Sequence, residues 1–238
     1  MRSILALAGL VVYTLILGII VIIIGIFSRG NAFQYFLSRL WSKLVLVTAG
    51  VRVNVRGIEN IPLNSSFVFM SNHQSHFDVI SLISTIPDRI YFLAKKELMR
   101  IPVFGWAMYL MGHITIDRSD REEAFKSIDK AVEKVKKGIN VLVFPEGTRS
   151  PTGDLLPFKK GGFVLAIKGG IPIIPIGIYG SNRILPKGSI KINPGTISIA
   201  VGKPIETLGF NLENKERLME RVREEITRLR EEAKLNLR

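Results

Sequence analysis

The sequence predicts an α/β fold in which helices flank a central mixed sheet, preceded by a two-helix segment that anchors the chain to a membrane. Three observations support this. Short apolar segments alternate with helix-like segments after residue 50. A long uncharged stretch opens the chain, and the net charge is +13. We therefore divide the 238 residues into an N-terminal helical pair, 1–50, and one domain, 51–238, that ends in an amphipathic helix.

The first helix is predicted over Ser3–Phe27, which contains no charged residue. At 1.5 Å per residue it would be roughly 37 Å long, enough to cross a hydrocarbon core of about 30 Å. It exceeds the roughly 7–15 apolar residues of a signal peptide, so we exclude that interpretation. Basic residues follow this stretch more than they precede it, which predicts that the domain lies on the cytoplasmic side of the cell membrane. Spanning the bilayer and returning within one leaflet both stay open.

The second helix is predicted over Ala32–Thr48, with Asn31 as its cap. Its polar side chains form one stripe and apolar side chains cover the rest, which indicates a helix lying in the membrane interface. The stripe consists of Gln34, Ser38 and Ser42, with Arg39 and Lys43 beside it.

The domain is predicted to alternate strands and helices. The expected strands are Val51–Arg56, Ser66–Met70, Tyr91–Ala94, His113–Asp117, Asn140–Phe144, Ile173–Tyr179 and Thr196–Val201. The expected helices begin near Asp78 and cover Glu97–Leu110, Arg121–Lys137, Gly161–Lys168 and Lys215–Leu237. The last of these has an apolar stripe that we expect to pack onto the domain. The segment Ile171–Ile178 is most simply a buried strand, but Pro172 and Pro175 argue against a central, fully paired one.

A histidine and an aspartate, His73 and Asp78, lie in the connection between a predicted strand and a predicted helix. An aspartate bonded to one imidazole nitrogen fixes the tautomer, so the other nitrogen can take a proton from a hydroxyl. On this spacing alone, a loop histidine beside a helix-capping aspartate is the more frequent outcome. His76 is a weaker candidate, because two residues separate it from Asp78 on an extended stretch.

The remaining composition excludes several other chemistries. The chain has no cysteine and three histidines, so we predict neither a thiol intermediate nor a metal site. Gly-x-Ser-x-Gly and Walker motifs are absent. If His73 is a base, the nucleophile would then be the hydroxyl of the substrate itself.

Four blocks of this sequence, in order, resemble those of the glycerolipid acyltransferase family, and most closely its lysophosphatidic acid acyltransferase branch. They begin with Asn72-His73 through Asp78 and continue with Gly112 through Arg118, Phe144-Pro145-Glu146-Gly147-Thr148-Arg149-Ser150 and Ile171-Pro172-Ile173-Ile174-Pro175-Ile176. The resemblance covers roughly residues 51–201. Thr115 departs from it, because a larger apolar residue is expected there.

The resemblance implies a role for each block. His73 would be the catalytic base and Asp78 its partner. The glycerol phosphate would be bound by Arg118, Glu146, Gly147, Thr148 and Arg149, with Lys95 adding to the positive field. Arginine forks match a phosphate bidentately, whereas Glu146 would accept from a glycerol hydroxyl or hold an arginine. Ile171, Pro172, Ile173 and Pro175 would lie near the acyl chain.

The expected partners follow from the same features. A pI of about 10.1 beside a long apolar segment indicates an anionic membrane leaflet rather than nucleic acid. The resemblance implies lysophosphatidate as acceptor, acyl-CoA or acyl carrier protein as thioester donor, and no cofactor. Transfer to glycerol 3-phosphate or another lysophospholipid, or non-catalytic binding of anionic lipid, are the alternatives that the sequence leaves open.

Overall fold

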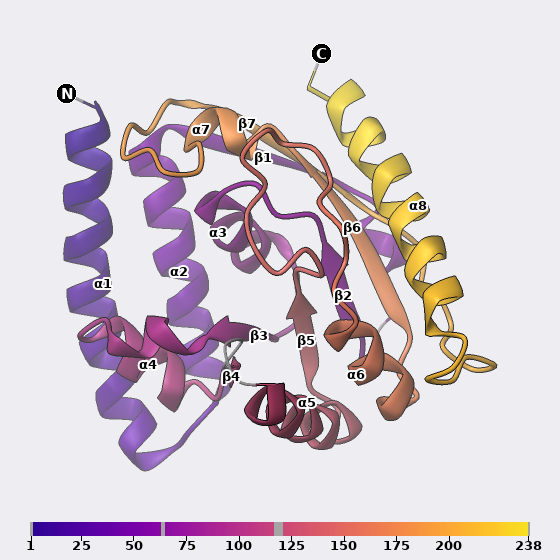
Figure 1. Ribbon diagram of the computed structural model, residues 1–238. Coiled ribbons are helices and arrows are strands. Elements are labelled where there is room, and N and C mark those ends of the chain that lie inside the picture. Colours follow the sequence, from indigo (N-terminus) through magenta and orange to yellow (C-terminus); the bar gives the residue numbers. More distant parts are fainter. Residues whose placement is uncertain (1, 63–64, 117–120, 238) are drawn as a thin grey trace.

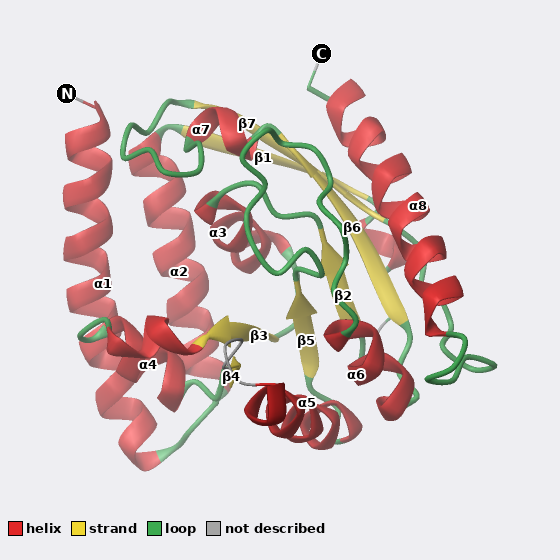
Figure 2. Ribbon diagram, viewed as in Figure 1, coloured by secondary structure: helices red, strands yellow, loops and turns green. Residues whose placement is uncertain are grey.

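The computed structural model describes residues 2–62, 65–116 and 121–237. Within these residues a seven-stranded sheet has the order β1-β7-β6-β2-β5-β3-β4 (Figure 2). The strands are β1 Val51–Arg56, β2 Val68–Ser71, β3 Ile90–Lys95, β4 Ile114–Ile116, β5 Asn140–Val143, β6 Ile173–Tyr179 and β7 Gly195–Val201. Neighbouring strands are parallel except β6 and β7, which are antiparallel. This confirms the predicted mixed sheet.

Helices cover both faces of the sheet (Figure 1). On one face lie α5 Arg121–Lys136, α6 Gly161–Gly169 and α8 Lys215–Leu235, and on the other α2 Ala32–Ala49 and α3 His76–Thr85. Side chains alternate between the two cores, as a strand requires. Val68 and Met70 of β2 pack toward α5, α6 and α8, whereas Phe69 packs toward α2 and α3. The end of β2 is therefore held from both sides.

The C-terminal helix α8 packs against β6 and β7, as its apolar stripe predicts. Its buried side chains are Leu218, Val222, Ile226, Leu229 and Ala233. These recur every three or four residues, so one face of the helix is covered by the sheet and the other carries charges. The stripe fixes α8 as a rigid layer over the strands.

The first helix, α1 Arg2–Phe27, lies beside α2 and against α4 Phe104–Leu110. Two glycines allow the close approach to the α4 region. A β-carbon at Gly18 would lie 2.7 Å from Val103, and one at Gly25 would lie 2.6 Å from Leu110. By length and composition α1 could cross a membrane: an 18-residue window of it has a mean hydropathy of 3.1, and only 11% of that window is buried in the protein.

The orientation of α2 differs from the prediction. Its polar stripe does not face water as a unit: Gln34 and Ser42 are fully buried, and Arg39 donates to the carbonyls of Ser84 and Pro87. The Gln34 side chain donates to the Val21 carbonyl (2.9 Å), and it also forms a capping box with Asn31. Large apolar side chains point outward instead: Phe33, Phe36, Leu40 and Val47 are exposed. Hydrogen bonds of Gln34, Trp41 and Thr48 thus join α2 to α1, while large apolar side chains cover the outer surface of the pair.

The helix predicted over Glu97–Leu110 is wrong as a single element. The structure has a 3-10 helix, η2 Lys96–Arg100, followed by α4. Pro102 lies between the two, and proline cannot sit inside a continuous helix without losing a hydrogen bond. Val103 then takes a left-handed φ of 62°, which redirects the chain into α4. Two short elements complete the structure, η1 Ile58–Asn60 and α7 Ser181–Ile184.

The strand β6 is central, contrary to the expectation based on Pro172 and Pro175, but it is not fully paired, as that expectation implies. Pro172 precedes the strand. Pro175 directs its carbonyl toward β7, where the Gly202 N–H donates to it (2.9 Å). The N–H group that proline lacks would point to the same side as its carbonyl. The missing donor therefore also faces β7, in the gap between the isolated bridge at Ile173 and the pairing with β7 that starts at Ile176. The interruption in pairing absorbs the proline.

Candidate active site

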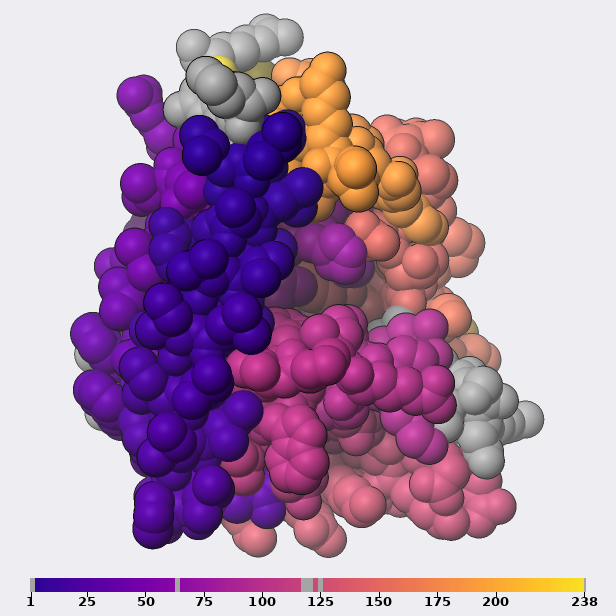
Figure 3. Space-filling model, turned by 90° about the vertical axis from the view of Figure 1, so that its left-hand side faces the viewer, coloured from indigo at the N-terminus to yellow at the C-terminus, as the bar shows by residue number. Residues whose placement is uncertain are grey.

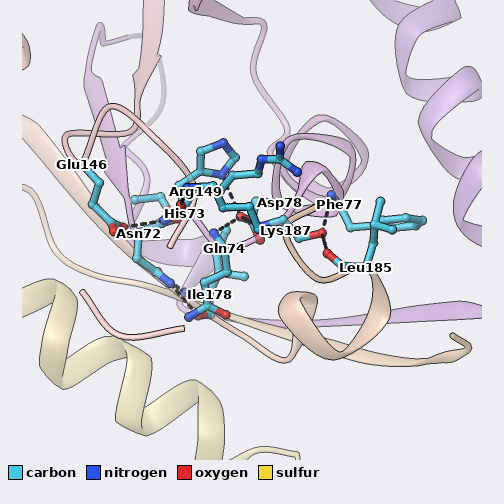
Figure 4. A network of polar contacts seen from close by, with 12 residues as sticks. Asn72, His73, Gln74, Phe77, Asp78, Glu146, Arg149, Ile178, Leu185 and Lys187 are labelled. Carbon is cyan, nitrogen blue, oxygen red and sulfur yellow. Dashed lines mark hydrogen bonds and ion pairs between the residues drawn. The ribbon is translucent and has the colours of Figure 1, made fainter. Parts of the chain in front are cut away.

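The site lies where β2 and β5 end. These strands are adjacent and parallel, so their carboxyl ends meet at one edge of the sheet, where α/β proteins bind ligands. The loop 72–75 follows β2, and the turn 144–150 follows β5. Asn72 extends the edge of β2: its amide donates to the Ile178 carbonyl (2.9 Å) and accepts from the Ile178 N–H (2.7 Å). Figure 4 shows this network around His73.

The predicted pair His73 and Asp78 is brought together. Asp78 is fully buried at the third position of α3, in a capping box with Ser75. Its Oδ2 accepts from the His73 Nδ1 (2.8 Å) and from the backbone N–H groups of Gln74 (2.6 Å) and Ser75 (2.8 Å). A carboxylate oxygen can only accept, so Nδ1 carries the proton and Nε2 keeps its lone pair. Asp78 therefore caps the helix and orients the imidazole.

His76 lies at the start of α3 with much of its side chain exposed. Partial desolvation of the ring and the positive charge of Arg149 lower the pKa of His76. Among the contacts that the structure describes, the Asp78 carboxylate bonds to His73 and not to His76. The geometry thus favours His73 as the oriented imidazole.

The turn after β5 surrounds His73. The Phe144 ring stacks on the imidazole with centroids 4.0 Å apart and planes inclined by 17°. Glu146 accepts from the His73 N–H through Oε1 (2.7 Å), and the Ser150 N–H donates to the His73 carbonyl (2.7 Å). The ring and both backbone polar groups of His73 are thus held by one segment.

Glu146 is only 2% exposed. Its second oxygen, Oε2, accepts from the Leu156 N–H (2.9 Å). Burial raises the pKa of Glu146, and the two backbone donors act in the opposite direction. The sequence suggested a glycerol hydroxyl or an arginine as the partner of this carboxylate, whereas the structure shows a backbone N–H on each oxygen.

Three cations with half-buried or exposed side chains lie at the same turn. Lys159 lies over Gly147, whose φ is 70°, and a β-carbon added there would come within 3.4 Å of the Lys159 Nζ. Lys187 donates to the Arg149 carbonyl (2.8 Å) and to the Thr148 hydroxyl (3.4 Å). Within the described part of the chain, no carboxylate forms an ion pair with Arg149, Lys159 or Lys187. Unpaired cations at the rim of a site fit an anionic ligand.

The space-filling view shows a hollow in the surface framed by α1, the η2–α4 segment and the loop that follows α7 (Figure 3). Lys187 belongs to that loop. No group of three or more histidine, aspartate or glutamate side chains in the described residues is arranged to hold a metal ion.

Comparison with known proteins gives the family. The acyltransferase family model matches residues 52–179. A chloroplastic 1-acyl-sn-glycerol-3-phosphate acyltransferase of Brassica napus is 39% identical over 175 residues, 73% of this chain and 50% of that protein. The 1-acyl-sn-glycerol-3-phosphate acyltransferase of Saccharomyces cerevisiae is 36% identical over 227 residues, 94% of this chain and 73% of that protein.

The chain belongs to the acyltransferase family. Its fold is similar to the crystal structure of the 1-acyl-sn-glycerophosphate acyltransferase from Thermotoga maritima, with a TM-score of 0.80, 29% identity and 98% of both chains covered. The chain spans about half the length of the Brassica relative.

The other predicted site residues of this acyltransferase lie farther from His73 or cannot be placed. Arg118 lies outside the described residues. Lys95 ends β3 at the same edge of the sheet, but its exposed ammonium pairs with Glu97 (2.8 Å). Their roles toward a phosphate stay predictions.

The fourth block is not brought together with His73. The Pro172 carbonyl accepts from the Val68 N–H (3.0 Å), so Ile171, Pro172 and Ile173 lie beside the start of β2, at the opposite edge of the sheet. Pro175 pairs with Met70 inside the sheet. Their place near an acyl chain stays a prediction.

Sequence reasoning missed five contributors to the site: Asn72, Phe144, Ser150, Lys159 and Lys187. The roles of Asn72, Phe144 and Ser150 lie within blocks that it did quote, but stacking and backbone hydrogen bonds carry no spacing signal. Lys187 is 38 residues from Arg149 along the chain, and only the fold brings them together.

Proposed function

We propose that this acyltransferase transfers a fatty acyl group from a thioester, acyl-CoA or acyl carrier protein, to the sn-2 hydroxyl of 1-acylglycerol 3-phosphate, giving phosphatidic acid. The observation that supports this most is the His73 imidazole: a buried carboxylate holds its Nδ1–H at 2.8 Å, and unpaired cations lie close by. The relatives named as 1-acyl-sn-glycerol-3-phosphate acyltransferases support the choice of acceptor.

The reaction balances without a covalent enzyme intermediate. Nε2 of His73 takes the proton of the acceptor hydroxyl while its oxygen attacks the thioester carbon. The tetrahedral intermediate collapses with cleavage of the carbon–sulfur bond, and the imidazolium returns the proton to the departing thiolate. Asp78 stabilises the imidazolium through its charge and keeps the tautomer correct.

The phosphate of the acceptor is bound by Arg149, in our proposal, with Lys187 and Lys159 adding positive charge. These side chains are half-buried or exposed, whereas Glu146 is buried. Arg118 and Lys95 keep the phosphate-binding role that the sequence predicts.

We also propose that the acceptor reaches the site from a membrane. The exposed large apolar side chains concentrate on α1, α2 and α4, including Leu15 and Phe27 of α1 and Trp106 of α4. Two of these helices, α1 and α4, frame the hollow in Figure 3. Apolar surface of this kind, on helices whose polar groups face each other, fits a bilayer better than water. We place the site at headgroup depth on the cytoplasmic side of the cell membrane.

The proposal is tested with a panel of acceptors and one thioester donor, in detergent micelles and in vesicles. Lysophosphatidate should be acylated at least about tenfold better than glycerol 3-phosphate or a lysophospholipid with a larger headgroup. His73→Ala should remove nearly all turnover, whereas His76→Ala should retain most of it. Preference for another acceptor would reassign the substrate, and an active His73→Ala protein would refute the base.

A further inference from the structure

Glu146 presents a problem if it is taken as a ligand-binding residue. Each of its two oxygens already accepts a backbone N–H, one from His73 and one from Leu156. With 2% of the side chain exposed, a substrate hydroxyl has little access to either oxygen. A carboxylate suits this place for another reason, because it offers two acceptors to donors that arrive from two segments, whereas an amide offers one.

The backbone of Leu156 connects Glu146 to α8. Its carbonyl accepts from Arg223 Nη1 (2.8 Å), and the Leu155 carbonyl accepts from Arg223 Nη2 (3.1 Å). The Arg223 guanidinium also lies over the Phe158 ring, 5.1 Å from its centroid. Four hydrogen bonds thus connect α8 to His73 in one line, through the Arg223 side chain, the backbone of Leu155 and Leu156, and the Glu146 carboxylate.

We propose that Glu146 and Arg223 are positioning residues, which together fix the backbone of His73 relative to the C-terminal helix α8. The inference rests on the proposed function of His73 as the base. The His73 side chain is oriented by Asp78 and Phe144. The peptide after His73 is bonded to Asp78 and Ser150, whereas the peptide that carries the His73 N–H is bonded to Glu146. The Glu146 line holds that peptide and ties it to α8, the helix packed on β6 and β7.

This arrangement has a kinetic consequence. Reacting atoms must lie about 3–3.5 Å apart, and a misplacement of about 1 Å can cost about 100-fold in rate. Breaking the hydrogen bonds that join Arg223 to His73 would displace the base. It would leave Arg149, Lys159 and Lys187 in place at the rim. The chemical step should therefore slow without weaker binding of the phosphate-bearing acceptor. A Glu146 that bound glycerol would give the opposite pattern, a raised KM.

The test uses full-length protein in detergent with the variants Glu146→Gln, Arg223→Met, Arg223→Lys and the double variant Glu146→Gln/Arg223→Met. Arg217→Met is the matched control, since Arg217 is an exposed arginine on the same helix. The measurements are kcat, the KM for lysophosphatidate, the melting temperature and amide hydrogen exchange at the His73 N–H.

Glu146→Gln should lower kcat about 10–100-fold and Arg223→Met about 3–10-fold, with KM changed less than about twofold. Arg223→Lys should be milder than Arg223→Met because it keeps a donor. The double variant should lose less than the product of the two single losses, since both break one line. Exchange at the His73 N–H should accelerate in the Glu146 variant, whereas Arg217→Met should match the parent in every measurement.

A Glu146→Gln protein with raised KM and unchanged kcat would overturn the proposal and return the residue to substrate binding. Multiplicative losses in the double variant, or an Arg223→Met protein indistinguishable from Arg217→Met, would remove Arg223 from it. Amide exchange does not depend on the reaction. If lysophosphatidate proves not to be the acceptor, unchanged exchange at His73 in Glu146→Gln would still refute the line, and faster exchange would still support it.

Discussion

Replacing Asp78 by asparagine should lower kcat about 5–30-fold while the protein remains folded. The structure sets this expectation through Oδ2, which accepts from two backbone N–H groups as well as from His73. Two fixed donors at Gln74 and Ser75 oblige an asparagine to place its oxygen, not its NH₂, at the same point. Its NH₂ then takes the place of Oδ1, which has no hydrogen-bond partner in the protein.

The imidazole consequently keeps its tautomer in this variant and loses only the charge of its partner. A hydrogen bond to a charged group contributes about 1.5–3 kcal/mol against about 0.5–1.5 kcal/mol for a neutral one. The difference, about 1–2 kcal/mol, corresponds to the predicted loss at about 1.4 kcal/mol per factor of ten. A flipped amide that reversed the tautomer would instead cost about 10⁴-fold, as in serine hydrolases.

Asp78→Ala is the contrasting variant. It leaves the buried N–H groups of Gln74 and Ser75 without an acceptor, at about 1–3 kcal/mol each. That is a large part of a typical total stability of about 5–15 kcal/mol, so a lower melting temperature should accompany its loss of activity.

The assay is release of the donor thiol, followed with a thiol reagent. The chain has no cysteine, so the protein itself contributes no signal. An Asp78→Asn protein as inactive as His73→Ala but equally stable would refute the argument that the backbone donors preserve the tautomer. Unchanged kcat would show that the Asp78 charge plays no part in the reaction.

Three further predictions concern other parts of the molecule. Arg149→Ala should raise the KM for lysophosphatidate about tenfold or more, with incomplete rescue by lysine and no effect of the control Lys191→Ala. Burial and the Lys134 ammonium lower the pKa of His113 to about 4. As the pH falls, the unfolded chain therefore takes up a proton at this histidine before the folded protein does. The free energy of unfolding should fall by up to about 3 kcal/mol between about pH 6.5 and 4, and the contribution of His113 should remain nearly constant above about pH 6.5. Denaturation measurements on His113→Gln should lack this contribution. Ile16→Glu should reduce flotation with anionic vesicles and leave activity in detergent unchanged.

Helices and strands whose apolar residues recur with a clear period could be predicted, because burial of one face imposes that period on the sequence. β1 and β6 have the predicted limits, and the stripe of α8 packs as expected. The break at Pro102 was visible in the sequence, but an apolar run on both sides favoured one helix. The orientation of α2 was not visible, because an exposed polar stripe and a stripe facing a second helix have the same spacing.

The residue types of the site could be predicted from the sequence, but the role of each residue could be predicted less well. His73 and Asp78 are close in sequence, so a short loop suffices to join them. β2 and β5 are neighbours because of the sheet topology, which neither strand encodes locally. Without knowing that they are neighbours, no partner for Glu146 can be predicted from the sequence. A carboxylate beside an arginine suggested a ligand, whereas the structure gives it the backbone of His73.

The distribution of charge also bears on how an acceptor would be oriented. Two buried carboxylates, Asp78 and Glu146, lie in hydrogen-bond contact with His73, while Arg149, Lys159 and Lys187 are half-buried or exposed at the turn. A phosphate near the imidazole would be repelled by the carboxylates and attracted toward the rim. A neutral hydroxyl meets no such repulsion and can reach Nε2. If the acceptor is a glycerol phosphate, as we propose, the polarity that would draw its phosphate to the rim would also direct its hydroxyl inward, before any specific contact is made.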